Sequence, residues 1–384
     1  MSTRIQVNPD LLHWALQRAG VSADALADKF PKLNDWLGGV LAPTLKQLEA
    51  FANTTHTAIG LLFLPHPPEE PLPIPDFRKL PGGQFSRPSI NLLDTIYLCQ
   101  QRQAWYQEYQ HLHGMEPVAF IGSASTADEV PEAAARIAQA IGFDLIERQQ
   151  SPNWSEAMRR FISQIEQTGI LVMVSGVVGS NTHRPLNVEE FRGFALADPF
   201  APLIFINGKD SKAAQMFTLA HELAHLWLGE SGVSDTQAAT QHDEQIECWC
   251  NAVAAELLVP LKQLRPVYDP ENELNEEMQR LARRFKVSTL VIVRRLFDLG
   301  VIDQEVLWVT YRAELEQVRA LGSREGSGGD FYNTLSARTG KRFIRALVAS
   351  TLEGQTQFTD AFRMLGIKKT ATFYEKARRL GLHG

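Results

Sequence analysis

Two histidines and a glutamate stand close together in the string His221-Glu222-Leu223-Ala224-His225. His221 and His225 are four residues apart in a segment with a helical pattern, so their rings project from one face, one turn apart. Two imidazoles placed in this way can bind one Zn²⁺ at about 2.0–2.1 Å each. Glu222 follows the first candidate ligand, where it can contact metal-bound water and act as a general base. The segment predicts part of a zinc-peptidase site; the alternative is a surface helix that carries two histidines.

A catalytic zinc needs a third protein ligand and one position left for water or substrate. The best candidate is Glu247, 22 residues beyond His225 and near the start of the next helical pattern. Asn251 lies one turn later on the same face, placed to hydrogen-bond a ligand imidazole. Glu244 is the runner-up ligand, although an acid near a helix N-terminus is also favoured by the helix dipole.

His242 and Cys248 are weaker ligand candidates. We expect Cys248 and Cys250 to be small buried helix residues, because free cysteine behaves as a small hydrophobe. Together with Cys99 they are too few for a disulfide framework, which places the chain in a reducing cytoplasm.

The elements around these residues are mainly helical. Apolar periodicity predicts helices over 134–146, 154–167, 213–228 and 244–258, and short β-prone runs over 170–174, 193–197 and 203–206. We therefore expect a mainly α protein with a small antiparallel sheet, of the α+β class. If the run 203–206 forms a sheet edge beside the metal helix, it can pair with an extended peptide.

Composition and charge limit the function classes. The apolar fraction of 44% and charged fraction of 21% are ordinary for a globular protein, and no apolar run approaches the roughly 20 residues of a membrane span. The N-terminus has no apolar signal-peptide core. A net charge of −6 argues against indiscriminate nucleic-acid binding. However, residues 331–384 hold ten Lys/Arg against three acids, a basic tail of the kind that meets nucleic acid or an acidic partner.

Two stretches of the sequence resemble the ImmA/IrrE metallo-endopeptidases. The first is Phe-Thr-Leu-Ala-His-Glu-Leu-Ala-His at 217–225, and the second, Glu-x-x-x-Asn-Ala-x-Ala-Ala-Glu-Leu-Leu-Val-Pro, covers 247–260. The resemblance covers roughly 150–300 and the paired motifs are specific. Val253 stands where the family usually has phenylalanine, a departure that affects packing.

The resemblance implies that His221, His225 and Glu247 are zinc ligands and that Glu222 is the catalytic base. Members of this family typically cleave a regulatory protein, often a repressor. The whole chain also resembles long bacterial members found beside a PIN-type toxin, which act as antitoxin-like regulators. The partners implied are a specific protein substrate or a toxin encoded nearby.

On this basis we divide the chain into six segments. They are an XRE-like helix-turn-helix module of five short helices (1–65), a Pro-rich linker arm (66–88), a helical bridge (89–150), a zincin-like metallopeptidase domain (151–265), a helix-turn-helix-like extension (266–322) and a basic helical C-terminal region (323–384). A Gly/Ser break at 322–329 separates the last two.

DNA binding by the N-terminal module stays open. Lys32 and Asn34 are its candidate DNA-contacting residues, but the module is slightly acidic overall and the same fold serves protein docking. The segment 280–295 is more basic, although a solvated helix face also explains it. Two further interpretations stay beside the peptidase: a non-catalytic antitoxin with a vestigial or structural zinc site, and a repressor that acts on DNA alone.

Overall fold

The computed structural model describes residues 3–76, 88–234, 241–321 and 331–382. Side chains of residues 234, 241–244 and 317–321 also lie outside the description. The chain divides into two compact units, one formed by Met1–Pro73 with Phe85–Ile96 and the other by Ile74–Gln84 with Tyr97–Gly384. The predicted break at 322–329 falls outside the described residues.

The N-terminal unit contains five short helical segments, as predicted. They are α1 (Pro9–Ala19), η1 (Asp24–Leu26), α2 (Leu33–Leu37), α3 (Leu45–Thr54) and η2 (Ile59–Phe63), of which η1 and η2 are 3₁₀ turns. Local signals explain their bounds: Asn8 caps α1, and Gly20 ends it with a φ of 66°. Thr44 and Gln47 form a capping box at the start of α3.

The second unit is built on a four-stranded mixed sheet with the order β1-β3-β2-β4. Its strands are β1 (Leu171–Ser175), β2 (Gly193–Leu196), β3 (Leu203–Asn207) and β4 (Gly232–Ser234). The α+β class is confirmed, but the expectation of a wholly antiparallel sheet is wrong, because β1 and β3 are parallel. A hairpin joins β2 to β3 and inserts β3 between β2 and β1, so β3 runs in the direction of β1.

The sheet order also overturns the hypothesis that the run 203–206 is an edge. As β3, it is paired on both sides and cannot accept an extended peptide. The outer side of β4 is met by the Pro-rich arm, where the Val233 N–H donates to Pro75 O at 3.0 Å. The strand at the opposite edge of the sheet, β1, packs against α14 (Phe331–Thr339).

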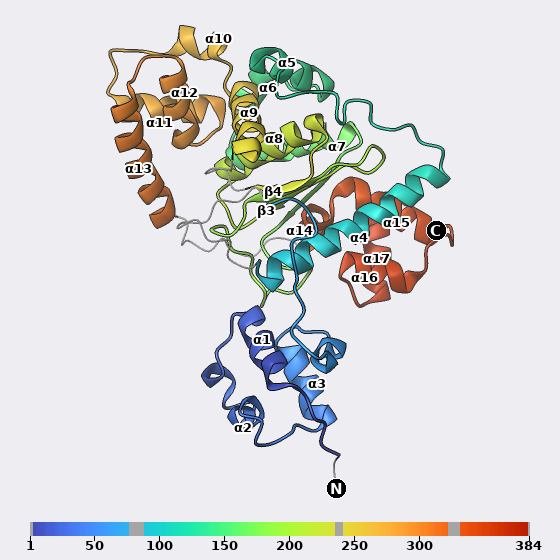
Figure 1. Cartoon of the computed structure of the whole chain (residues 1–384). Helices are drawn as coiled ribbons and strands as arrows, with labels where there is room; N and C mark the ends of the chain where they lie inside the picture. Colours follow the sequence, from blue (N-terminus) through green and yellow to red (C-terminus); the bar gives the residue numbers. More distant parts are fainter. Residues whose placement is uncertain (1–2, 77–87, 235–240, 322–330, 383–384) are drawn as a thin grey trace. The chain divides into compact units, whose positions relative to one another are not determined.

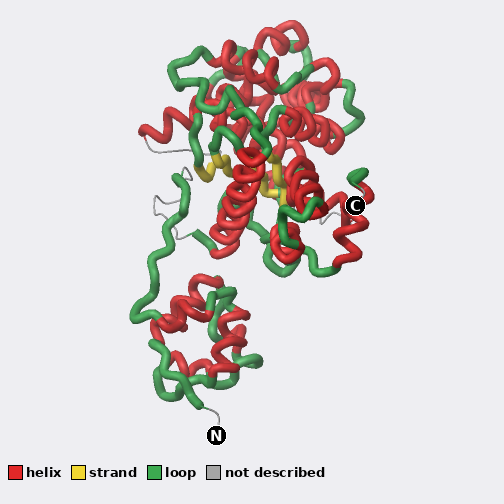
Figure 2. Tube along the Cα trace, turned by 90° about the vertical axis from the view of Figure 1, so that its right-hand side faces the viewer, coloured by secondary structure: helices red, strands yellow, loops and turns green. Residues whose placement is uncertain are grey.

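Helices pack on the sheet and on one another to form the core of this unit (Figure 1). They are α5 (Val130–Ala140), α6 (Leu145–Gln149), α7 (Trp154–Gln167), α8 (Lys212–Leu228) and α9 (Gln241–Leu258). Of these, α7 and α8 contact the strands, whereas α5 packs on α9. In Figure 2 the yellow strands lie among red helices. The single helix expected over 134–146 is two helices, because Gly142 has a φ of 63° and Asp144 caps α6.

Residues 261–321 continue the same core. They form α10 (Leu261–Leu264), η3 (Arg265–Val267), α11 (Leu274–Phe285), α12 (Thr289–Asp298) and α13 (Gln304–Leu321). Apolar side chains of α11 and α12 belong to one cluster with those of α8 and α9. Glu256 of α9 and Arg295 of α12 form a buried ion pair that joins the two parts.

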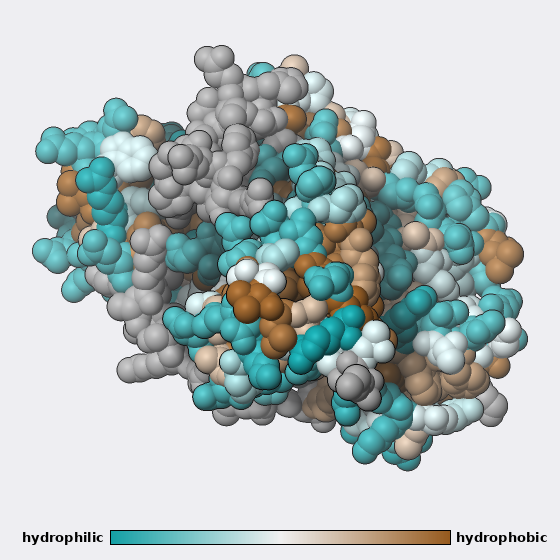
Figure 3. All heavy atoms as spheres, turned by 60° about the horizontal axis from the view of Figure 1, so that its bottom comes forward, coloured by the Kyte–Doolittle hydropathy of each residue, from teal (hydrophilic) through white to brown (hydrophobic). Residues whose placement is uncertain are grey.

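The last helices are α15 (Lys341–Leu352), α16 (Phe358–Leu365) and α17 (Thr370–Arg379), and the long α4 covers Ile90–Leu112. The buried Arg102 of α4 donates to the main-chain oxygens of Met364 in α16 and Arg338 in α14, and so joins these two helices to α4. None of the described helices has the length and apolarity that crossing a membrane requires. On the face drawn in Figure 3, apolar side chains reach the surface in groups between polar ones.

Candidate metal centre

The HExxH segment lies in the second half of α8, one of the most buried helices of the protein. Ser211 caps the helix by accepting from the Ala214 N–H, and Gly229 ends it with a φ of 75°. The two histidines are fully buried, at 0% exposure for His221 and 1% for His225. The alternative of a surface helix with two histidines is therefore wrong.

Three side chains from two helices converge here. The Nε2 atoms of His221 and His225 are 3.0 Å apart. The Glu247 carboxylate of α9 spans both rings, with Oε2 3.2 Å from His221 Nε2 and Oε1 3.0 Å from His225 Nε2. Across the described ranges this is the one group of three or more His, Cys, Asp or Glu side chains whose ligand atoms are close enough to hold a metal ion.

The donor set fits a zinc ion. With bonds of about 2.0–2.1 Å, two ligand atoms of a tetrahedral zinc are about 3.3 Å apart. This is close to the distances between the two Nε2 atoms and from each of them to a Glu247 oxygen. Two neutral imidazoles that present Nε2 lone pairs to each other repel unless a proton or cation lies between them. His221, His225 and Glu247 therefore make a suitable three-ligand face for zinc.

The electrostatics of the cluster show how strongly the three groups interact. Burial lowers the pKa of His221, but Glu247, Glu222 and Asn251 outweigh it and leave that pKa raised. Burial dominates at His225 and lowers its pKa, and the neighbouring His221 adds to the effect. Burial raises the pKa of Glu247, but the two rings outweigh it and lower the value to about 2. The carboxylate thus stays ionised, as a metal ligand must.

Glu222 is held between its own helix and strand β2. Its side chain is 0% exposed, and its charge raises the pKa of the adjacent His221 ring. A Cβ atom added to Gly193 of β2 would lie 3.0 Å from Glu222 Oε1 and 2.7 Å from Thr218 Cγ2. Glycine at this position therefore lets the strand approach the carboxylate. Sequence reasoning missed Gly193, although a glycine inside a strand is a sign of close backbone approach.

The other predicted site residues have mixed outcomes. Asn251 is near enough to His221 to raise its pKa, but no hydrogen bond of ordinary geometry reaches Asn251 Oδ1. The side chains of His242 and Glu244 lie outside the described part of the structure. Cys250 is buried as expected, whereas the expectation for Cys248 is wrong, because it lies on the exposed side of α9.

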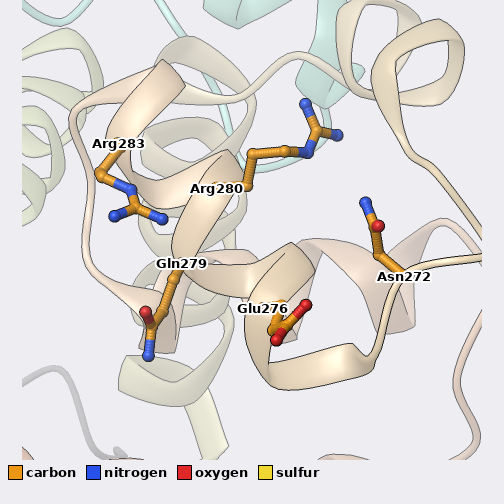
Figure 4. A pocket seen from close by; sticks show the side chains of 5 residues that line it. All are labelled: Asn272, Glu276, Gln279, Arg280 and Arg283. Carbon is orange, nitrogen blue, oxygen red and sulfur yellow. The ribbon is translucent and has the colours of Figure 1, made fainter.

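Lys32 and Asn34, the candidate DNA-contacting residues, belong to the other compact unit of the chain. Lys32 and Asn34 are exposed at the start of α2, a helix of only five residues. In the basic segment 280–295, Arg280 is paired with Glu277. Arg280 and Arg283 line the depression of Figure 4 with Asn272, Glu276 and Gln279. None of these five residues belongs to the His-His-Glu cluster.

The C-terminal part of the chain matches a family of its own. Residues 339–379, from the end of α14 to α17, match a family described only as a domain of unknown function.

Comparisons with known proteins agree with the geometry of the centre. The chain is 34% identical over 96 residues to the "Radiation response metalloprotease IrrE" of Deinococcus deserti, a match that covers 24% of this chain and 34% of that protein. It is 31% identical over 96 residues to the protein of the same name from Deinococcus radiodurans, covering 24% and 29%. The matched part thus spans about a third of the relatives' length. Residues 165–297, which include α8 and α9, match the IrrE N-terminal-like domain family, so this part of the chain is similar to that family.

Proposed function

We propose that this chain is a zinc-dependent endopeptidase that hydrolyses a peptide bond in a specific protein partner. The observation that carries the proposal is the convergence of His221, His225 and Glu247 within 3.0–3.2 Å of one another, with the Glu222 carboxylate beside them. A purely structural zinc site has four closed ligands, and it has no use for a carboxylate in the position of Glu222. The similarity to metalloproteases over this same segment supports the proposal.

In this mechanism His221, His225 and Glu247 hold the metal ion. Once bound, zinc supplies Lewis acidity that polarises the scissile carbonyl and activates water. Glu222 takes the proton of the attacking water and passes it to the leaving amine. Its position on α8, packed against Gly193, limits the movement of the carboxylate beside His221. Burial excludes bulk water, which strengthens each electrostatic interaction in the site.

The proposed partner is a regulatory protein, either a repressor or a toxin encoded near this gene. Peptidases of narrow specificity show no activity without their partner, so general protease substrates do not test the proposal. The three free thiols accord with the reducing cytoplasm as the place of action.

Co-expression with the product of the adjacent gene provides the test. We expect the wild-type chain to carry one zinc per molecule and to cleave that product. Glu222→Gln is expected to retain zinc and the complex but to lose cleavage. Glu276→Gln, an exposed change of the same chemistry on α11, is the matched control and is expected to cleave normally. An unchanged biological effect of Glu222→Gln, with cleavage lost or never seen, would show that the chain acts as a binder. Unchanged cleavage would exclude Glu222 as the general base.

A further inference from the structure

The C-terminal helices form a small three-helix unit. Helix α15 packs on both α16 and α17, and the stretch that they form carries many buried apolar side chains. These are Phe343, Ile344, Leu347, Val348, Ala361, Met364, Leu365, Ile367, Phe373 and Ala377. The unit coincides with residues 339–379, the stretch that matches a family of its own.

Helices α16 and α17 have the form of a helix-turn-helix. Four residues, 366–369, join the eight-residue α16 to the ten-residue α17. The turn begins at Gly366, whose φ of 66° favours glycine, and an added Cβ there would also meet Ser180 Oγ at 2.8 Å. Three- to four-residue turns that contain glycine are typical of the motif. Phe358, at the start of α16, packs on the Phe373 ring at 5.2 Å, so α16 crosses the N-terminal half of α17.

The two sides of α17 differ sharply. Phe373, Lys376 and Ala377 are buried against the rest of the unit. On the opposite side Ala371, Tyr374 and Arg378 are exposed at i, i+3 and i+7, with Tyr374 at 50%. Thr370 is exposed at the N-terminal end of the same helix. Hydroxyl, methyl and guanidinium groups of this kind contact base edges in the major groove.

The charge around α17 is strongly positive. Residues 331–384 hold ten Lys/Arg against three acids in a chain whose net charge is −6. Two of those acids pair with surface arginines, Asp360 with Arg363 and Glu375 with Arg378 and Arg379, and ten cations against three acids still leave an excess of seven positive charges. Lys368 and Lys369 are exposed directly before α17, and neither has an ion-pair partner among the described residues.

These two lysines do not stabilise the helix. A cation near a helix N-terminus opposes the helix dipole. Both the lysines and the dipole favour a nearby anion, and backbone phosphates of DNA supply one at this position in helix-turn-helix complexes.

The other two candidate units lack this combination. In the pair α11–α12, Val291, Ile292 and Arg295 of the second helix are buried against the peptidase core. In the N-terminal unit the candidate helix α2 has five residues and carries Asp35 in its first turn.

We propose that α15–α17 is a DNA-binding module that places α17 in the major groove of double-helical DNA. Lys368 and Lys369 contact phosphates, and Tyr374 and Arg378 face the bases. This inference is independent of the zinc centre, and it assigns a second activity to the chain.

The test measures binding of the full chain to a fluorescein-labelled 30-base-pair duplex of mixed sequence, by fluorescence anisotropy between 50 and 200 mM salt. We expect Lys368→Gln/Lys369→Gln to weaken binding at least tenfold at 100 mM salt. The slope of log Kd against log salt should fall by about two, since each phosphate contact contributes about 0.9. Tyr374→Ala should weaken binding and leave that slope unchanged. Lys262→Gln/Arg265→Gln removes two exposed charges from α10 and η3, and it is the matched control that should bind normally.

Three outcomes would overturn the proposal. One is the absence of duplex binding at 50 mM salt by the folded chain. The second is an equal loss of binding in the control and the lysine variant, or loss in Lys32→Gln/Asn34→Ala instead, which would assign binding to general charge or to the N-terminal unit. The third is stronger binding to a 30-nucleotide single-stranded RNA of the same sequence. Circular dichroism and zinc content show that each variant is folded, and Glu222→Gln should bind DNA like the wild type.

Discussion

Gly193→Ala tests whether the close approach of β2 to α8 holds the proposed general base. The added methyl would lie 2.7 Å from Thr218 Cγ2, 2.9 Å from Phe205 O and 3.0 Å from Glu222 Oε1. The first two atoms belong to a β-branched side chain and to the backbone, so neither can move freely. Overpacking of this kind costs about 1–3 kcal/mol, and three simultaneous contacts predict a loss of about 2–3 kcal/mol in the free energy of unfolding.

The assay combines urea unfolding with zinc affinity and with cleavage of the partner. We expect lower stability and slower cleavage, since Glu222 or β2 must move to accommodate the methyl. Adding Thr218→Ser removes the nearest methyl but keeps a hydroxyl to donate to Ala214 O, so it should restore about 1 kcal/mol. Gly60→Ala is the control, because nothing lies within 4 Å of its added Cβ. The reasoning fails if Gly193→Ala unfolds like the wild type, or if Thr218→Ser restores nothing.

Three further predictions follow from the buried groups. The pKa of Glu247 is lowered to about 2 from 4.5, so the stability that its ionised carboxylate contributes is complete above pH 4.5 and is lost as the pH falls toward 2. In urea titrations of zinc-free protein, the difference in unfolding free energy between the wild type and Glu247→Gln should shrink by roughly 1–3 kcal/mol over that range. Glu256→Ala removes one of the two carboxylates that pair with the buried Arg295, which keeps Asp298, and should cost about 1–3 kcal/mol. Adding Arg295→Met should recover most of this in the same unfolding assay. A maleimide should label the exposed Cys248 within minutes and the buried Cys99 only on unfolding, because burial raises the pKa of Cys99 to about 12. Mass spectrometry of the labelled peptides gives the rate at each cysteine, and equal rates at both would contradict the prediction.

Elements set by local signals could be predicted from the sequence. The helix expected over 154–167 has those bounds in the structure, because Asn153 caps its start and Gly169 follows its end with a φ of 107°. The four-residue spacing of His221 and His225 likewise predicts that both rings lie on one face of one helix, as they do in α8. Apolar periodicity alone predicts one helix over 134–146, whereas the positive φ of Gly142 separates α5 from α6.

Features that depend on distant parts of the chain could not be predicted in this way. The parallel pairing of β1 with β3 follows from the insertion of the β2–β3 hairpin, which period-two patterning does not encode. Strand β4 has only three residues, too few for period-two patterning to predict it. Exposure of Cys248 depends on which side of α9 faces α8, because the buried Glu247 takes the inward position and its neighbour must point away.

Glu247 joins two helices at the proposed metal centre. Residues 221, 222, 225 and 247 bury four ionisable side chains within one core, at 2% exposure or less. Burial of unpaired charge is costly, and pairing among these groups recovers only part of that cost. The divalent cation that we propose for this site would compensate the remainder, so its binding energy would add to the free energy of folding. α8 and α9 pack against each other and share their core with α11 and α12, so any change that separates the two helices should lower zinc affinity, however distant it is from the ligands. The Glu256–Arg295 pair lies within that shared core, and we therefore expect its loss to weaken zinc binding as well as stability.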